Sequence, residues 1–182
     1  MAVQMELSRI LIRELTDYQL IELREVGGER GFPIVIGLPE AQAIERRLKG
    51  MRAPRPQTHE LLATVIEELG GTLEAITISD LDDHTFFATL SVRLPDGEVR
   101  EIDSRPSDAI ALGVATDVPI FAEEHVIDEA QRQGRFAAGV VGVGDAEQGA
   151  LIIEACAMGM AAGGEAAVDV DDLSGEEGRC RR

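Results

Sequence analysis

Apolar and polar residues alternate along the first part of the chain, and the spacing then changes to that of helices. Alternation at every second position predicts β-strands, because successive strand side chains point to opposite faces. This pattern predicts three strands, over residues 5–15, 18–26 and 32–37. Apolar residues that recur every three or four positions predict amphipathic helices. The first two helices are expected over residues 39–49 and 58–69.

The middle of the chain predicts a β-hairpin followed by a helix. A strand is expected over residues 73–79, and two more over 84–94 and 98–103 flank an Asp-Gly pair that favours a tight turn. Pro106 then opens a helix to about Ala115, since proline suits the first turn, where its missing N–H would be unpaired. A short strand and a last helical segment are expected over residues 119–121 and 123–131.

The composition changes beyond Gly134, where glycine, alanine and acidic residues dominate. Such a sequence, poor in aromatic side chains, is typical of a flexible appendage. We therefore expect a domain over residues 1–131 and a flexible Gly/Ala-rich acidic tail over residues 132–182. Within this tail, residues 146–160 have a spacing that would allow a short helix.

The overall composition fits one reduced globular protein and argues against nucleic acid as a default partner. Aromatic residues make up 3% of the 182 residues, so the core must be aliphatic and few rings are present for base stacking. The formal net charge is −17, whereas a phosphate backbone demands local positive charge. Two cysteines form neither a disulfide framework nor a zinc signature. No stretch is apolar enough to span a bilayer, so we expect a cytoplasmic protein without a membrane partner.

The segment around Pro106 concentrates polar chemistry at a helix start. Free N–H groups and the helix dipole favour anions there, and a neighbouring arginine can grip a phosphate with two donors. We expect Arg105 and Ser107 to contact phosphate and Asp108 to accept a proton or bind a metal together with Asp103. The alternative is structural: Arg105 bridges Asp103 or Asp108 to fix the helix start, and Asp108 simply suits a first turn.

A second arginine-proline pair, Arg55-Pro56, precedes another helix. His59 is the only histidine inside a motif, and its neutral form at a helix start would suit a general base. Glu60 would orient it or bind a metal, and Arg55 would hold phosphate as Arg105 does. The alternatives are a structural histidine bonded to a backbone carbonyl and a solvated first-turn glutamate.

Taken together, these motifs make the chain resemble the bifunctional nuclease (BFN) domain family. The resemblance covers about residues 5–131 and rests on four segments, PRPQTHELL (54–62), SRPSDAIAL (104–112), FPIVIG (32–37) and VPIF (118–121). It implies an α+β fold, a compact domain with a mainly antiparallel sheet packed by about three to four helices. It also implies homo-oligomers, and DNA or RNA as partners through DNase and RNase activity.

Two functional hypotheses follow. The first is a nuclease that hydrolyses phosphodiester bonds of DNA or RNA with the assistance of Mg²⁺ or Mn²⁺. Its expected residues are catalytic His59, Glu60 and Asp108, phosphate-binding Arg55, Arg105 and Ser107, and metal-binding Asp103 and Asp108. The second is a non-catalytic oligomeric module that binds a small anion or a protein partner. The nuclease hypothesis requires the side chains of both motifs to converge in one exposed cleft.

Overall fold

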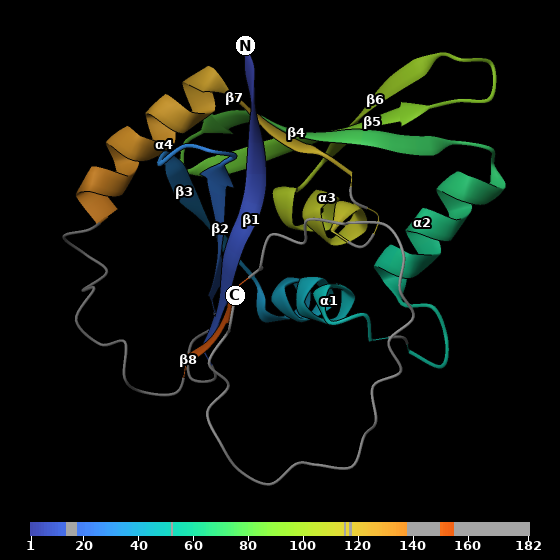
Figure 1. The fold of residues 1–182 in the computed structure, drawn as a ribbon, viewed down its shortest axis with the longest axis horizontal. Coiled ribbons are helices and arrows are strands. Elements are labelled where there is room, and N and C mark those ends of the chain that lie inside the picture. Colours follow the sequence, from blue (N-terminus) through green and yellow to red (C-terminus); the bar gives the residue numbers. More distant parts are fainter. Residues whose placement is uncertain (14–17, 52, 115, 117, 138–149, 155–182) are drawn as a thin grey trace, which may run out of the picture.

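The computed structural model describes residues 1–13, 18–51, 53–114, 116, 118–137 and 150–154. Strands and helices are mixed along the chain, and Figure 1 shows their arrangement. In chain order they are β1 (Ala2–Arg13), β2 (Gln19–Glu25), β3 (Gly31–Ile36), α1 (Leu38–Leu48), α2 (Thr58–Glu68), β4 (Thr72–Asp82), β5 (Thr85–Arg93), β6 (Val99–Ser104), α3 (Pro106–Gly113), β7 (Ile120–Glu123), α4 (Glu124–Ala137) and β8 (Ala150–Glu154). The expected α+β fold is confirmed.

All described strands belong to one sheet with the order β3-β2-β1-β7-β4-β5-β6. Among the described pairs of strands, only β4 and β7 run parallel, so the sheet is mainly antiparallel as expected. The long strand β1 pairs with β2 on one edge. On its other edge it pairs with β7 through Ala2–Met5 and with β8 through Arg9–Arg13.

Strand β8 corrects one expectation from the sequence. The spacing of residues 146–160 allowed a short helix, but Ala150–Glu154 form a strand against β1. The unpaired backbone groups of β1 beyond β7 explain the difference, because they offer a ladder to a segment rich in β-branched residues. Helix α4 also continues to Ala137, past the domain boundary expected at residue 131. The rest of the expected tail, residues 138–149 and 155–182, lies outside the described residues.

The core is aliphatic and lies on one face of the sheet. Buried and more exposed positions alternate along β2 and β3, as a sheet with one covered face requires. Helix α3 fills the centre and packs against α1, α2, β4 and β5, and every residue of α3 except Asp108 is buried. A Cβ at Gly113 would lie 2.4 Å from Ile76 Cδ1, so glycine allows α3 to approach β4 closely. The burial of α3 therefore leaves Asp108 as its one residue that reaches solvent.

The two halves of the sheet run in different directions in Figure 1, with β1–β3 in one group and β4–β6 in the other. Phe32 of β3 stacks on Phe86 of β5 with ring centroids 5.4 Å apart, which ties the two groups together. Helix α4 packs on β3, β4 and β7. None of the described helices combines the length and the apolar character needed to cross a membrane.

Candidate functional site

Three helices begin around one cavity of about 320 Å³. Its lining comes from one side of α1, from the first turns of α2 and α3 and from the residue before each of these two helices: Pro39, Glu40, Ala43, Arg46, Gln57, Thr58, His59, Arg105 and Asp108. Proline occupies the first turn of α1 and of α3, where the missing N–H costs no hydrogen bond. Three helix starts directed at one space favour negative charge in it.

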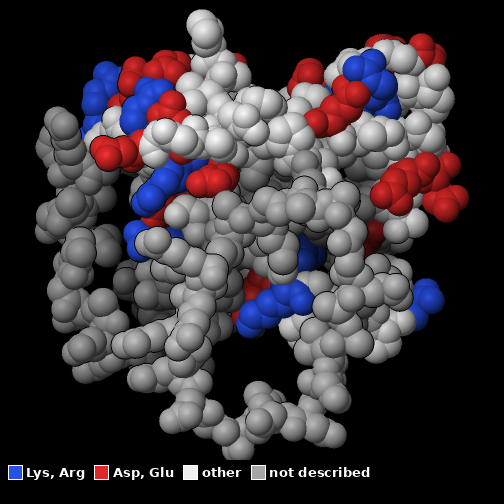
Figure 2. Space-filling view, viewed as in Figure 1, with Lys and Arg blue, Asp and Glu red and all other residues white. Residues whose placement is uncertain are grey.

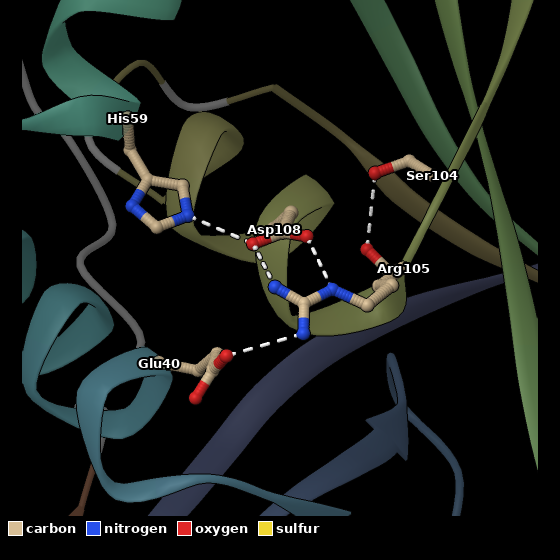
Figure 3. Close-up of polar contacts among 5 residues, drawn as sticks. All are labelled: Glu40, His59, Ser104, Arg105 and Asp108. Carbon is tan, nitrogen blue, oxygen red and sulfur yellow. Dashed lines mark hydrogen bonds and ion pairs between the residues drawn. The ribbon is translucent and has the colours of Figure 1, made fainter.

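Asp108 lies at the centre of the polar contacts drawn in Figure 3. Its Oδ1 is 3.0 Å from His59 Nε2 and accepts a hydrogen bond of 3.1 Å from Arg105 Nη2, while its Oδ2 accepts one of 2.7 Å from Arg105 Nε. Burial alone would raise the pKa of Asp108, but the hydrogen bonds and charges of Arg105 and His59 lower it below its ordinary value. Asp108 is therefore an ionised acceptor at neutral pH.

Arg105 is the N-cap residue of α3, and its guanidinium connects two helices. It grips Asp108 with two donors, and its Nη1 donates to Glu40 Oε1 of α1 at 3.2 Å. Hydrogen bonding to Asp108, with a smaller contribution from Glu40, raises the pKa of Arg105 further above its ordinary range. Two-thirds of the side chain (66%) remains exposed. The guanidinium thus fixes a carboxylate within the protein and still has a solvent-facing surface at the cavity.

His59 lies in the first turn of α2, with 18% of its side chain exposed. Its Nε2 faces the ionised carboxylate of Asp108, which favours the tautomer with the hydrogen on Nε2. The other ring nitrogen, Nδ1, then keeps its lone pair and points away from Asp108 (Figure 3). In the neutral form of the ring, Nδ1 is the nitrogen that can accept a proton.

The structure does not bring all the expected phosphate and metal residues to this cavity. Arg55 is exposed in the segment before α2, does not line the cavity, and forms no ion pair with the described part of the chain. Asp103 is exposed in β6, where it pairs across the ladder with Thr89, and it does not line the cavity either. Only Arg105, His59 and Asp108 of the sequence candidates line it.

Ser107 and Glu60 are next to site residues in the sequence but do not line the cavity. Ser107 is buried, with 6% of its surface exposed, and is not part of the cavity lining. Glu60 Oε2 accepts a hydrogen bond of 2.8 Å from the backbone N–H of Gln57 and so completes a capping box at the start of α2. Its observed contact is therefore the capping of the helix that carries His59.

The donor set at the cavity does not fit a divalent ion as it stands. Among the described residues, no group of three or more His, Cys, Asp or Glu side chains is arranged to hold a metal. Both carboxylates of the cavity, Asp108 and Glu40, already accept hydrogen bonds from Arg105. An ion at either one would have to compete with a guanidinium that neutralises the same charge.

Two cavity residues, Glu40 and Arg46 of α1, were missed by the sequence reasoning. The sequence does contain a pattern that could have identified Glu40. The α1 helix starts with Pro39-Glu40, and α3 starts with a proline followed two residues later by Asp108, so both place a carboxylate in a proline-opened first turn. No local pattern indicates that the two helix starts face the same arginine.

Comparisons with known proteins give one family model and two similar proteins. The family model for the bifunctional nuclease domain matches residues 21–134. Two uncharacterized proteins, from two strains of Mycobacterium tuberculosis, are each 37% identical to this chain over 121 residues, which cover 66% of the chain and 71% of each relative. The match includes all the residues that line the cavity.

Proposed function

The chain belongs to the bifunctional nuclease domain family, and on this premise we propose that it hydrolyses phosphodiester bonds of DNA or RNA at the cavity between α1, α2 and α3. One observation carries the proposal. His59 and Asp108, from the two motifs of the chain, lie 3.0 Å apart at a cavity bordered by three helix starts. This geometry supports a role for His59 as a proton acceptor beside a space where an anion is favoured.

In this proposal His59 is the general base. Its Nδ1 takes a proton from water as the water oxygen bonds to phosphorus. The bond from phosphorus to the leaving oxygen breaks, and solvent protonates that oxygen. Asp108 accepts a hydrogen bond from the Nε2–H group of His59 and so holds the ring in this tautomer. Its negative charge also stabilises the imidazolium that forms. The exposed surface of Arg105 offsets the charge on the phosphate oxygens.

The mechanism proposed here is written without Mg²⁺ or Mn²⁺, and the assay measures whether either ion increases the rate. Because Asp108 and Glu40 are both bonded to Arg105, we route no step through a metal. Assays therefore compare the protein in EDTA with the protein in each ion.

The test is cleavage of labelled single-stranded DNA and RNA by purified protein and by His59→Ala and Asp108→Asn. Loss of a general base lowers the rate by about 100-fold or more, so His59→Ala is expected to fall by at least that factor. Asp108→Asn is expected to lower the rate as well, because it removes the acceptor that holds His59 in its tautomer. His125→Ala is the matched control, because His125 is exposed and bonds Asp80 outside the cavity. Cleavage that survives His59→Ala at the wild-type rate contradicts the proposal and indicates a contaminating nuclease.

One observation favours a second candidate, the non-catalytic oligomeric module. Helix α2 contains no buried residue, and it carries an apolar stripe made of Leu61, Leu62, Val65 and Leu69, each between 41% and 75% exposed. A stripe of this kind is typical of a helix that packs on a partner. We propose a second copy of this chain as that partner, with the two α2 helices antiparallel.

Charge complementarity supports the antiparallel arrangement. Arg55 precedes α2, and Glu67 and Glu68 lie in its last turn, all of them exposed. Antiparallel packing places the basic segment of one copy beside the acidic end of the other. The stripe is short, so we expect a dimer that dissociates on dilution.

A further inference from the structure

The cavity has the size of a small-molecule site. Its volume of about 320 Å³ falls at the lower end of the range of about 300–1,000 Å³ that is common for small ligands. The starts of α2 and α3 and one side of α1 border it. We propose that its preferred substrate is a small phosphodiester of about dinucleotide size, not a long nucleic acid strand. This inference rests on the proposed function and narrows its substrate class.

Charge is the first argument for a short substrate. The cavity is lined by two acidic and two basic side chains, Glu40, Asp108, Arg46 and Arg105, so it is close to neutral. The whole chain, in contrast, carries −17. A small diester brings one negative charge into this nearly neutral cavity. A long strand brings further phosphates close to a protein of net charge −17, and at low salt they are repelled.

Figure 2 illustrates this surface from one side. Acidic side chains gather over the end of α2 that leads into β4, where Glu67 and Glu68 are exposed. Basic side chains on the described part of this face are scattered and often stand beside acidic ones. The described part of this face shows no continuous stretch of basic side chains, which is the usual requirement for polymer binding.

The second argument is the lack of a stacking platform. Proteins that hold single strands stack the bases on aromatic rings, with a gain of about 1–3 kcal/mol per base. The substantially exposed aromatic side chains among the described residues are Tyr18 and Phe87, and neither lines the cavity. A longer strand therefore adds repulsion at this site without adding stacking.

The groups that line the cavity suit the binding of one phosphate group. The helix starts and the exposed surface of Arg105 hold its oxygens, and His59 lines the same cavity. The two substituents on phosphorus then need only a small space each.

The experiment compares a dinucleotide with a single strand of about sixteen nucleotides, at about 0.01 M and about 0.5 M salt. The expected kcat/KM per phosphodiester bond is about tenfold higher for the dinucleotide at low salt, and the gap narrows at high salt because the repulsion is screened. Equal or higher rates per bond on the long strand, falling with salt as in ordinary polymer binding, overturn the inference and leave the proposed function intact.

A charge variant separates repulsion from cavity size. Glu101 is exposed in β6, and the four residues from it to Arg105 span about 14 Å along an extended chain, which is within a Debye length at low salt. Glu101→Lys is expected to raise the low-salt rate on the long strand severalfold and the dinucleotide rate by a smaller factor, because several phosphates of the strand but only one of the dinucleotide feel the changed charge. An equal effect on both substrates contradicts the charge argument.

If neither substrate is hydrolysed, a binding measurement tests the inference. That outcome overturns the proposed function, and thermal shift with the same two ligands then tests the inference alone. Stabilisation by the dinucleotide, absent with the long strand and lost in Arg105→Ala, supports a small-diester site. Failure of the dinucleotide to stabilise the protein overturns the inference.

Discussion

His59 Nε2 lies 3.0 Å from Asp108 Oδ1, although the two residues are 49 positions apart in the sequence. The contact joins the first turn of α2 to the first turn of α3. Asp108 is the one residue of α3 that is not buried, so the fold leaves this carboxylate at the surface facing His59. The position of His59 relative to the cavity therefore depends on an ionised Asp108.

We predict that Asp108→Asn makes the free energy of unfolding less dependent on pH in the acidic range. The pKa of Asp108 is lowered in the folded protein, so the unfolded chain binds this proton more readily. The contribution of Asp108 to stability is therefore complete above the ordinary aspartate pKa of about 3.9 and is lost as the pH falls below it, through the lower folded-state pKa.

Denaturant unfolding from neutral pH down to about pH 2 measures this effect, because 3.9 lies within that window. The free energy of unfolding of the wild type is expected to fall more steeply below pH 4 than that of Asp108→Asn. Asp103→Asn controls for the removal of one negative charge, since Asp103 forms no ion pair with the described residues. Parallel curves for the wild type and Asp108→Asn contradict the prediction.

We predict that Arg105→Lys impairs activity more than stability. A lysine ammonium is a point charge and cannot hold both oxygens of Asp108 and reach Glu40 at the same time. Because the arginine is 66% exposed, the loss in unfolding free energy is expected to be at most about 1 kcal/mol. The loss of orientation at Asp108 lowers kcat by a larger factor, about tenfold. Thermal melting and steady-state rates on one preparation separate the two effects.

The first two helices were predicted closely because their boundaries are encoded locally, whereas the last helix, expected over residues 123–131, continues to Ala137. Expected helices over 39–49 and 58–69 correspond to α1 and α2 within one residue at each end. Prolines and glycines mark these boundaries, and their backbone restrictions act within a few residues. In contrast, β8 forms because β1 offers it an unpaired edge, and a partner more than a hundred residues away leaves no local signal.

The site was predicted in part for the same reason. His59, Arg105 and Asp108 were found from their helix-start motifs, and the structure brings them together. Arg55 has the same local motif as Arg105 but lies outside the cavity, because its arginine-proline pair precedes an exposed helix. Glu40 was missed, since its role depends on where α1 meets Arg105 in space.

Arg47 provides a prediction about the contact between α1, α2 and α3. Its Nη2 donates to the Leu112 carbonyl at the end of α3 at 3.2 Å, while its buried Nε has no hydrogen-bond partner. Burial lowers the pKa of Arg47, and the charges of Glu60 and Glu67 oppose this only in part. The guanidinium thus carries a desolvation cost that its contacts do not fully offset.

We predict that Arg47→Met changes the free energy of unfolding by less than about 1 kcal/mol, because methionine keeps the apolar packing of the stem without the buried charge. Arg47→Ala removes that packing as well and is expected to cost about 1–3 kcal/mol. Chemical unfolding of the two variants beside the wild type provides the comparison. A methionine variant as unstable as the alanine variant shows that the guanidinium itself stabilises the helix contact.

The apolar stripe of α2 gives the last prediction. Leu62 and Val65 lie near its middle and are 41% and 43% exposed. A glutamate at either position would be buried without a partner in an antiparallel α2 pair, and the cost of burying that charge shifts the dimer to monomer. Sedimentation across a range of protein concentrations is expected to show a dimer for the wild type and a monomer for Leu62→Glu and Val65→Glu.

Thr64→Glu is the matched control, because Thr64 is exposed on the same helix but outside the stripe. A charge swap tests the antiparallel direction. Arg55→Glu and Glu68→Arg should each weaken the dimer, because each places like charges opposite one another. The double variant restores opposite charges and should recover most of the affinity, and such recovery requires that the two positions face each other across the interface. A wild type that stays monomeric at every concentration, or single and double swaps that behave alike, excludes this arrangement.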